Sequence, residues 1–217
     1  MRILITAGGT REYIDSVRFI SNASSGRMGY ALARAAVGAG HKVTLVTAPT
    51  ALRPPNTAKV IKVETAAQMF DAVKRHFGRC DCLIMAAAVA DYTPAHPAKT
   101  KIKKTSKSLT IRLKPTTDIL KWAGRQKKKK GKTKKAEGKG QIVVGFALED
   151  KDLRQNAERK LKEKNLDMIV ANTPSAICAD ESAVHIKRSG RPWVAFASSR
   201  KAVTAQRVIR QIEDLFV

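Results

Sequence analysis

The stretch Ala7-Gly8-Gly9-Thr10-Arg11-Glu12, which leads on to Asn22-Ala23-Ser24-Ser25-Gly26, decides the fold. It follows an apolar run, residues 2–6, that is typical of a buried strand, and it precedes an alanine-rich helical segment, residues 26–37. Glycines let the backbone approach a ligand, and a helix N-terminus offers unpaired N–H groups and the positive end of a dipole. The stretch therefore predicts a phosphate-holding loop at the carboxyl end of a parallel strand.

This loop differs from an ordinary dinucleotide-binding loop. A G-x-G-x-x-G fingerprint lies directly on the first strand-to-helix turn, whereas here Gly8-Gly9 comes first and the helix begins only near Ser25. The second predicted strand ends in Thr47-Ala48-Pro49, without the acidic residue that a NAD site uses for the ribose hydroxyl. A tight turn that binds nothing is the alternative for Gly8-Gly9, but a mere connection rarely needs so long a polar loop.

Strands and helices alternate along the chain, which predicts an α/β fold. We expect a Rossmann-like, doubly wound, mostly parallel sheet flanked by helices, with a small C-terminal β-hairpin and a closing helix, all in one domain over 1–217. The predicted strands are 3–6, 42–46, 60–63, 83–85, 109–113, 142–147 and 168–171, followed by a hairpin of 184–186 and 194–196. The predicted helices are 26–37, 66–77, 118–123, 152–164 and 199–215, the last one capped by Ser198 or Ser199.

The chain is strongly basic, with a formal net charge of +24 over 217 residues. Nine basic residues and one acid lie between Arg125 and Lys139, so this window carries +8 and leaves +16 for the rest. Such a field attracts nucleic acid non-specifically and also steers small polyanions, so it does not separate the two. We expect residues 127–140 to be a solvated, mobile, Lys-rich insertion; a nucleic-acid or polyanion arm is the alternative.

The remaining composition favours a cytoplasmic protein. The longest apolar run, near 82–90, is too short to span a bilayer, and the N-terminus has no signal-peptide pattern. Cys80, Cys82 and Cys178 form no disulfide framework and no metal-ligand pattern, so we expect reduced, buried thiols. No metal site is predicted, and the four scattered histidines suggest surface or packing roles.

Six motifs occur in order, each at a predicted strand end. They are Ala7-Gly8-Gly9-Thr10-Arg11-Glu12, Val17 to Gly29, Ala86-Ala87-Ala88-Val89-Ala90-Asp91-Tyr92, Lys101-Ile102-Lys103-Lys104, Val144-Gly145-Phe146-Ala147 and Leu166 to Asn172. Together they resemble phosphopantothenoylcysteine synthetase, the ligase of coenzyme A biosynthesis. The resemblance covers roughly residues 2–172, apart from the lysine insertion.

The resemblance implies a two-step reaction. The carboxylate of 4′-phosphopantothenate attacks the α-phosphate of a nucleoside triphosphate, CTP in most of the family with ATP as the alternative, and pyrophosphate leaves. The amine of L-cysteine then displaces the nucleoside monophosphate from the acyl-nucleotidyl intermediate and forms an amide. The resemblance also implies Mg²⁺ on the phosphates and a homodimer whose sites are completed by the neighbouring subunit. Because no decarboxylase segment precedes Met1, we expect a stand-alone ligase with a separate decarboxylase partner.

The family's roles near the phosphates carry over to the first loop and its neighbours. Gly8, Gly9 and Thr10 resemble the phosphate loop, and Asn22 resembles the asparagine that holds the acyl intermediate; a turn residue is its alternative. Arg18 resembles an arginine needed for activity, with a surface ion pair as the alternative. The segment Ser24-Ser25-Gly26 resembles the start of the anion-receiving helix. Ala87 and Ala88 resemble the small residues that form the wall beside the base. Asp91 resembles the carboxylate that meets the nucleotide, and a loop cap is the alternative for Asp91.

Later motifs supply further expected contacts. Lys101 resembles the first lysine of the family's K-x-K-K flap, which acts on the α-phosphate, and a lysine suits this as a mobile point charge. Lys103 and Lys104 would add phosphate contacts, although a solvated loop is the alternative for any lysine run in this chain. Phe146 resembles the aromatic residue beside the nucleotide, with a core position as the alternative. Lys164 and Asn172 resemble the nucleotide-side end of the sheet.

Two departures and two competing functions complete the sequence-based interpretation. Thr116-Thr117 stands where the family often has Asn-Pro, and Ser182 stands where it commonly has asparagine.

A NAD(P)-dependent reductase is disfavoured by the missing second-strand acid and by the absence of a Tyr-x-x-x-Lys pair. A basic nucleic-acid-binding module would explain the charge, but its aromatic residues are sparse. If the chain is such a module, deletion of residues 127–140 should abolish nucleic-acid binding. If it is a ligase, the same deletion should leave catalysis largely intact.

Overall fold

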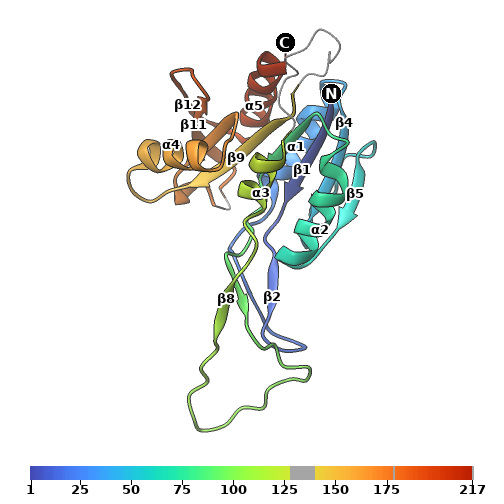
Figure 1. Ribbon diagram of the computed structural model, residues 1–217, viewed down its shortest axis with the longest axis vertical. Helices are drawn as coiled ribbons and strands as arrows, with labels where there is room; N and C mark the ends of the chain where they lie inside the picture. Colours follow the sequence, from blue (N-terminus) through green and yellow to red (C-terminus); the bar gives the residue numbers. More distant parts are fainter. Residues whose placement is uncertain (128–139, 178, 217) are drawn as a thin grey trace.

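Eight strands form one central sheet in the computed structural model, which describes residues 1–127, 140–177 and 179–216 (Figure 1). The strand order is β12-β11-β10-β9-β6-β1-β4-β5; neighbours from β5 to β10 run parallel, and β11 and β12 add two antiparallel strands at one edge. The predicted doubly wound, mostly parallel sheet is therefore confirmed. The bounds are Arg2–Ala7 for β1, Lys42–Thr47 for β4, Lys59–Lys62 for β5, Cys82–Met85 for β6, Ile142–Leu148 for β9, Met168–Asn172 for β10, Glu181–Arg188 for β11 and Trp193–Arg200 for β12.

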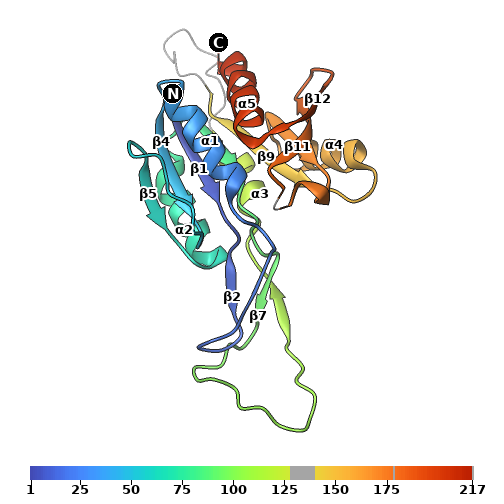
Figure 2. The ribbon, with the colours of Figure 1, turned by 180° about the vertical axis from the view of Figure 1, so that it is seen from behind.

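Helices cover both faces of this sheet, because alternate side chains of its inner strands point into two separate cores. On β1, Ile3 and Ile5 pack in the core beneath α1 and α5, whereas Leu4 packs in the core beneath α2, α3 and α4. Figure 1 looks onto the second layer and Figure 2, from behind, onto the first. Burial on both faces explains the continuous apolar runs of the central strands. The helices are α1 (Arg27–Gly38), α2 (Ala66–Phe77), α3 (Ile119–Gln126), α4 (Leu153–Glu163) and α5 (Lys201–Phe216), with a 3₁₀ turn, η1, at Pro174–Ala176.

A narrow arm, made of residues 11–21 and 92–115, projects from the carboxyl edge of the sheet, and both views show it extending away from the sheet (Figures 1 and 2). In it, β2 (Arg11–Tyr13) pairs antiparallel with β3 (Phe19–Ser21), and β7 (Tyr92–Pro94) pairs with β8 (Leu113–Pro115). The sequence predicted none of β2, β3 and β7.

Two sequence-based boundaries are wrong. The strand expected over 109–113 is wrong, because β8 begins only at Leu113, which pairs with Pro94 at the end of β7. The closing helix is not capped by Ser198 or Ser199, because β12 continues through both of them to Arg200 and α5 begins at Lys201. The other predicted helices and strands begin and end within a few residues of those observed.

Gly124 lies where α3 packs against the end of α4. A Cβ atom at this position would lie 1.8 Å from the backbone oxygen of Lys164, and the Gly124 carbonyl accepts a 2.7 Å hydrogen bond from Asn165 Nδ2. We expect Gly124→Ala to lower the free energy of unfolding by about 1–3 kcal/mol, as overpacking does elsewhere, measured by urea denaturation. The matched control is Gly78→Ala, where nothing lies within 4 Å of the added methyl group. An unchanged urea midpoint for Gly124→Ala would contradict the close contact.

The cysteines and the lysine insertion are described only in part. Cys80 and Cys82 are buried free thiols, as expected, and burial raises the pKa of Cys80 to about 12; Cys178 and residues 128–139 lie outside the described residues. At Lys127 the expectation of a solvated segment is wrong, because its side chain is 13% exposed and its Nζ lies 2.8 Å from Asp167 Oδ1. No helix in the described part of the chain is long and apolar enough to cross a membrane.

Candidate active site

The predicted phosphate loop leaves the sheet beside the loop that follows β6. Gly8 has a φ of +81°, and a Cβ there would lie 3.0 Å from the Ala48 carbonyl oxygen, so the position favours glycine. Gly9 and Ala88 form a parallel bridge: the Ala88 N–H donates to the Gly8 carbonyl at 2.9 Å, and the Thr10 N–H donates to the Ala88 carbonyl at 3.2 Å. The structure thus brings residues 8–10 and 87–88 together, although they are far apart in sequence.

The Thr10 side chain lies in the protein interior and stabilises these two loops. Its side chain is fully buried, and its hydroxyl oxygen accepts a 2.9 Å hydrogen bond from the Ala90 N–H. Thr116, one of the departures from the family pattern, adds a similar tie, because its hydroxyl donates to the Ala90 carbonyl at 2.6 Å and its N–H to the Asp91 carbonyl at 2.8 Å. Both threonine hydroxyls therefore hold the backbone of Ala90 in place, and the Thr10 hydroxyl is not exposed to a ligand.

Asn22 joins a third loop to the first two. Its Nδ2 donates to the carbonyl oxygens of Ala88 and Val89, each at 3.2 Å. A Cβ at Gly9 would lie 2.9 Å from the Asn22 carbonyl oxygen, so a larger residue at Gly9 would push the loops apart. Three loops of mostly small residues, 7–10, 22–26 and 86–91, therefore converge at the carboxyl ends of β1 and β6.

The N-terminus of α1 faces this convergence. Gly26, with a φ of +76°, precedes the helix, and no side chain caps the first turn among the described residues. A Cβ at Gly26 would lie 3.3 Å from Gly8 Cα, so the helix start approaches the first loop closely. Ser24 Oγ accepts from the Gly26 N–H at 3.4 Å, and the Ser25 carbonyl accepts from Thr50 Oγ1 at 3.1 Å. The positive dipole end of a helix at such a place suits an anion.

Other predicted residues border the same edge. Ala87 follows β6, and its N–H donates to Thr6 Oγ1 at 3.2 Å. Asp91 is exposed and stands just before β7. Phe146, on β9, is half-buried against the core beneath α1 and α5, and Asn172 ends β10, where its carbonyl accepts from the Glu149 N–H at 3.0 Å.

Four predicted site residues lie elsewhere in this chain. Arg18, Lys101 and Lys103 belong to the arm, away from the loops at the carboxyl edge (Figures 1 and 2). Lys164 directly follows α4 and precedes β10, which places its backbone toward the amino edge of the sheet, and its Nζ lies 2.9 Å from Asp118 Oδ2. Burial would raise the pKa of Asp118, but the Lys121 amide and the Lys164 ammonium group outweigh it, so this pKa lies below its usual value.

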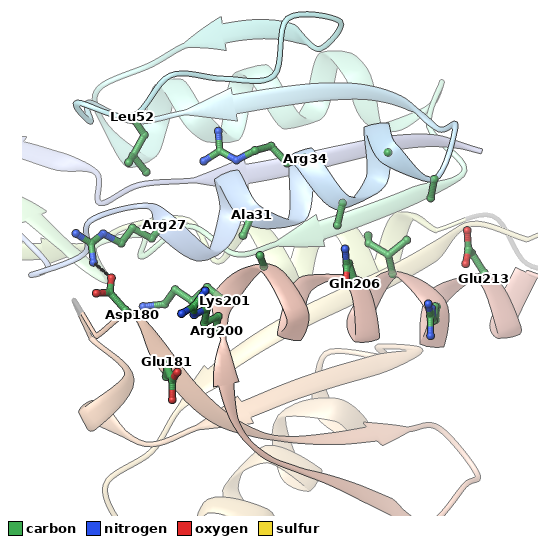
Figure 3. A pocket seen from close by; sticks show the side chains of 16 residues that line it. Arg27, Ala31, Arg34, Leu52, Asp180, Glu181, Arg200, Lys201, Gln206 and Glu213 are labelled. Atoms are coloured by element: carbon green, nitrogen blue, oxygen red, sulfur yellow. Dashed lines mark hydrogen bonds and ion pairs between the residues drawn. The ribbon is translucent and has the colours of Figure 1, made fainter.

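A large groove begins beside the start of α1 and extends along the seam between α1 and α5 (Figure 3). It has a volume of about 1060 Å³ and is lined by none of the predicted site residues. Two of the arginines that line it are engaged with the protein, since Arg27 pairs with Asp180 at 2.5 Å and Arg34 donates to the Arg53 carbonyl at 2.8 Å. We place the candidate active site at the carboxyl edge instead, where loops and a helix N-terminus converge.

Two positions have features that sequence reasoning missed. Asp15, in the turn between β2 and β3, is buried and bonded to Arg18, but nothing in its sequence context marks it. Ser182, the second departure, is 5% exposed and lies on β11 beside a shift in register, and its hydroxyl has no hydrogen-bond partner among the described residues. No group of three or more metal-ligating side chains is found in the described part of the chain.

The fold is that of an α/β protein in which three loops and a helix N-terminus converge at the carboxyl edge of a mostly parallel sheet. The chain belongs to the family of the DNA/pantothenate metabolism flavoprotein C-terminal domain, which matches residues 1–216. It is 46% identical over 175 residues to the coenzyme A biosynthesis bifunctional protein CoaBC of Bacillus subtilis (strain 168), covering 80% of this chain and 40% of that protein.

Further similarities agree with this family. The chain is 51% identical over 173 residues to a cysteine/cysteine sulfinic acid decarboxylase of an unknown prokaryotic organism, covering 79% of this chain and 45% of that protein. It thus spans about half the length of the curated relatives that it matches. The crystal structure of the C-terminal domain of CoaBC is 39% identical and superposes with a TM-score of 0.81 over 99% of this chain and 94% of that one. A Cab2 mutant in complex with phosphopantothenate-cysteine shares the fold alone, at 18% identity and a TM-score of 0.77 over 99% and 87% of the two chains.

Proposed function

We propose that this chain is a phosphopantothenate–cysteine ligase of coenzyme A biosynthesis, which joins 4′-phosphopantothenate to L-cysteine with CTP, or alternatively ATP, as the second substrate. The observation that carries the proposal is the convergence of three loops of mostly small residues at the start of α1, where no side chain caps the helix in the described part of the chain. It supports the proposal because this chain belongs to a family whose CoaBC members are coenzyme A biosynthesis proteins. The product would pass to a phosphopantothenoylcysteine decarboxylase.

The first step requires two anions to approach each other. A carboxylate oxygen of 4′-phosphopantothenate forms a bond to the α-phosphorus, the bond from this phosphorus to the β-phosphate oxygen breaks, and pyrophosphate leaves with the electron pair. The α1 amides after Gly26 would hold a phosphate group, and Lys101 would balance the charge that develops on the α-phosphate. Gly8 and Gly9 let the neighbouring loops pack closely, because a Cβ atom there would lie 3.0 Å from the Ala48 carbonyl oxygen and 2.9 Å from the Asn22 carbonyl oxygen.

In the second step the cysteine amine attacks the acyl carbonyl carbon, the bond from this carbon to the phosphate oxygen breaks, and the nucleoside monophosphate leaves. The amine loses a proton to solvent. Asn22, which lies between the loops, would orient the intermediate through its amide oxygen, because its Nδ2 already donates to Ala88 and Val89. Asp91 would meet the ribose or base, with Ala87 and Ala88 as the small wall beside it.

Mg²⁺ would enter with the nucleotide. Asp91 is the carboxylate at the start of the arm beside the converging loops, and no group of three ligating side chains exists in the described part of the chain. This donor set fits an ion held chiefly by phosphate oxygens and water, as is usual for Mg²⁺. When bound, the ion would neutralise charge on the phosphates, while the side chains named above position the substrates.

The active enzyme would be a homodimer with shared sites. Lys101, Lys103 and Arg18 belong to the arm, which extends away from the sheet that carries the converging loops (Figures 1 and 2). We infer that the arm of a second copy would complete each site. The arm also exposes large apolar side chains that a second copy would cover. They are Val17, Phe19, Tyr92, Leu109 and Leu113, which are 40–57% exposed.

Complementation between two inactive variants would test these shared sites. We expect co-expressed Lys101→Gln and Asn22→Asp chains to regain about a quarter of the wild-type activity, because half of the dimers are mixed and one of their two sites is intact. Each variant alone, purified in the same way, is the control. Failure of mixed dimers to exceed either parent would mean that each chain carries its own complete site.

Pyrophosphate release tests the ligase proposal itself. Purified protein with Mg²⁺, L-cysteine and either CTP or ATP should release pyrophosphate only when 4′-phosphopantothenate is present, and the CTP-to-ATP ratio identifies the nucleotide. No release from a folded dimer with either nucleotide would overturn the proposal. Salt-sensitive nucleic-acid binding that disappears on deletion of residues 127–140 would then support the nucleic-acid-binding module. A change in NADPH fluorescence on titration with the protein would support the reductase.

A further inference from the structure

Asp15 is a buried carboxylate in a turn that is otherwise exposed. It lies between β2 and β3, its side chain is fully buried, and its neighbours Ser16 and Val17 are exposed. One oxygen accepts from the Val17 and Arg18 N–H groups, both at 2.8 Å, and the other accepts from Arg18 Nε at 2.9 Å. Arg18 Nη2 completes an ion pair with Asp15 at 2.5 Å. Such a carboxylate is fixed in place by its own turn.

The same pair holds a residue of the lysine flap, 87 positions further along the chain. The Ile102 N–H donates to Asp15 Oδ2 at 3.1 Å, and the Ile102 carbonyl accepts from Arg18 Nη2 at 2.9 Å. Both backbone polar groups of Ile102 are therefore bonded to one ion pair. Ile102 stands between Lys101 and Lys103, whose side chains are both exposed.

Few other hydrogen bonds hold the flap, the loop that carries Lys101 to Lys104, in a fixed position. Residues 95–112 form a long loop without regular structure between β7 and β8. The Ala95 N–H donates to the Arg112 carbonyl at the base of this loop, and the Ala98 N–H donates to the Ile14 carbonyl at 2.9 Å. The second bond leads to the same turn as Asp15, so the β2–β3 turn is the support on which the flap rests.

We propose that Asp15 is a positioning residue, which acts with Arg18 to fix the backbone of Ile102 and so presents Lys101 to the α-phosphate. The inference rests on the proposed ligase function for its catalytic consequence, but the contact itself does not. The proposal also gives Arg18 a positioning role, because its Nε and Nη2 groups donate to Asp15 and to the Ile102 carbonyl.

The charge state of Asp15 agrees with this arrangement. The hydrogen bond from Arg18, together with the backbone N–H groups of Arg18, Val17 and Ile102, outweighs burial and holds the pKa of Asp15 well below its usual range. The carboxylate therefore stays ionised at neutral pH and keeps its acceptor role toward Ile102.

Amide hydrogen exchange tests the contact without any assay of activity. In Asp15→Asn the side chain loses its charge and one acceptor oxygen, so we expect the Ile102 amide to exchange at least about tenfold faster than in the wild type. Asp81→Asn is the matched control, because Asp81 also accepts from a backbone N–H and pairs with an arginine, Arg2, but at the amino edge of the sheet. Unchanged exchange at Ile102 in Asp15→Asn would overturn the contact.

A double-mutant comparison separates positioning from general stability. If Asp15 acts through Lys101, Asp15→Asn slows pyrophosphate release about tenfold in the wild-type background and less than about twofold in the Lys101→Gln background. Equal factors in both backgrounds would overturn the positioning role. Arg18→Lys is the second variant in case Asp15→Asn does not fold, because a lysine keeps the charge but cannot bond Asp15 and Ile102 through one planar group. If the wild type releases no pyrophosphate, the ligase proposal fails, and the exchange experiment still decides the contact.

Discussion

Lys101→Gln is expected to slow pyrophosphate release by about 10²–10³-fold, the range seen when one charge-stabilising donor is removed from an active site. Glutamine keeps most of the length and polarity of the side chain but removes its positive charge. The negative charge that develops on the α-phosphate would then lack its mobile counter-charge, while substrate binding by the carboxyl-edge loops would remain. A single-turnover assay with CTP, 4′-phosphopantothenate and no cysteine isolates this first step.

Lys107→Gln provides the matched control for this loss. Lys107 lies on the same loop and is also exposed, but it is outside the Lys101-Ile102-Lys103-Lys104 motif, and its N–H donates within the loop, to Thr105 Oγ1. The same change of charge there should leave the pyrophosphate burst within about twofold of the wild type, since long-range screening weakens a distant exposed charge. A normal burst in Lys101→Gln would remove Lys101 from the reaction, whereas equal losses in both variants would point to the general field of this basic chain.

The sheet could be predicted because its signals are local. The apolar runs of β1 and β6 are buried on both faces, and the amphipathic pattern of α2 marks its outer face, so each element is visible from its own residues. The arm could not be predicted in this way. Its strands are three residues long and depend on partners elsewhere in the chain, and the alternation over 109–113 does not show where a partner ends.

The site could be predicted as a meeting of loops but not as a set of roles. The order of the motifs at strand ends placed Gly8, Asn22 and Ala88 at one edge, since carboxyl ends of parallel strands share an edge. It could not show that Thr10 points inward, because the direction of one hydroxyl depends on the Ala90 amide it bonds. Nor could it show that Arg18 bonds Ile102, because that contact joins two loops of the arm.

Asn22→Asp is expected to reduce amide formation by about 10²-fold, with a smaller effect on the first step. Asn22 Nδ2 donates to the carbonyl oxygens of Ala88 and Val89. A carboxylate cannot donate, so it would place a negative charge against two carbonyl oxygens and near the phosphate of the intermediate. The loop of 22–26 would move away from that of 86–91, and the acyl intermediate would lose its orientation.

Asn22→Ala separates these two causes, because it removes the donor without adding a charge. We expect amide formation to fall in the order wild type, Asn22→Ala, Asn22→Asp, when preformed intermediate is mixed with L-cysteine and the amide is quantified. The difference between the two variants then reports repulsion, and the difference between Asn22→Ala and the wild type reports the lost hydrogen bonds. Equal rates for the two variants would assign Asn22 to holding the loops together. Wild-type rates in Asn22→Asp would remove Asn22 from the site. The reason is that a carboxylate between two carbonyl oxygens and a phosphate cannot leave a reaction at that place unchanged.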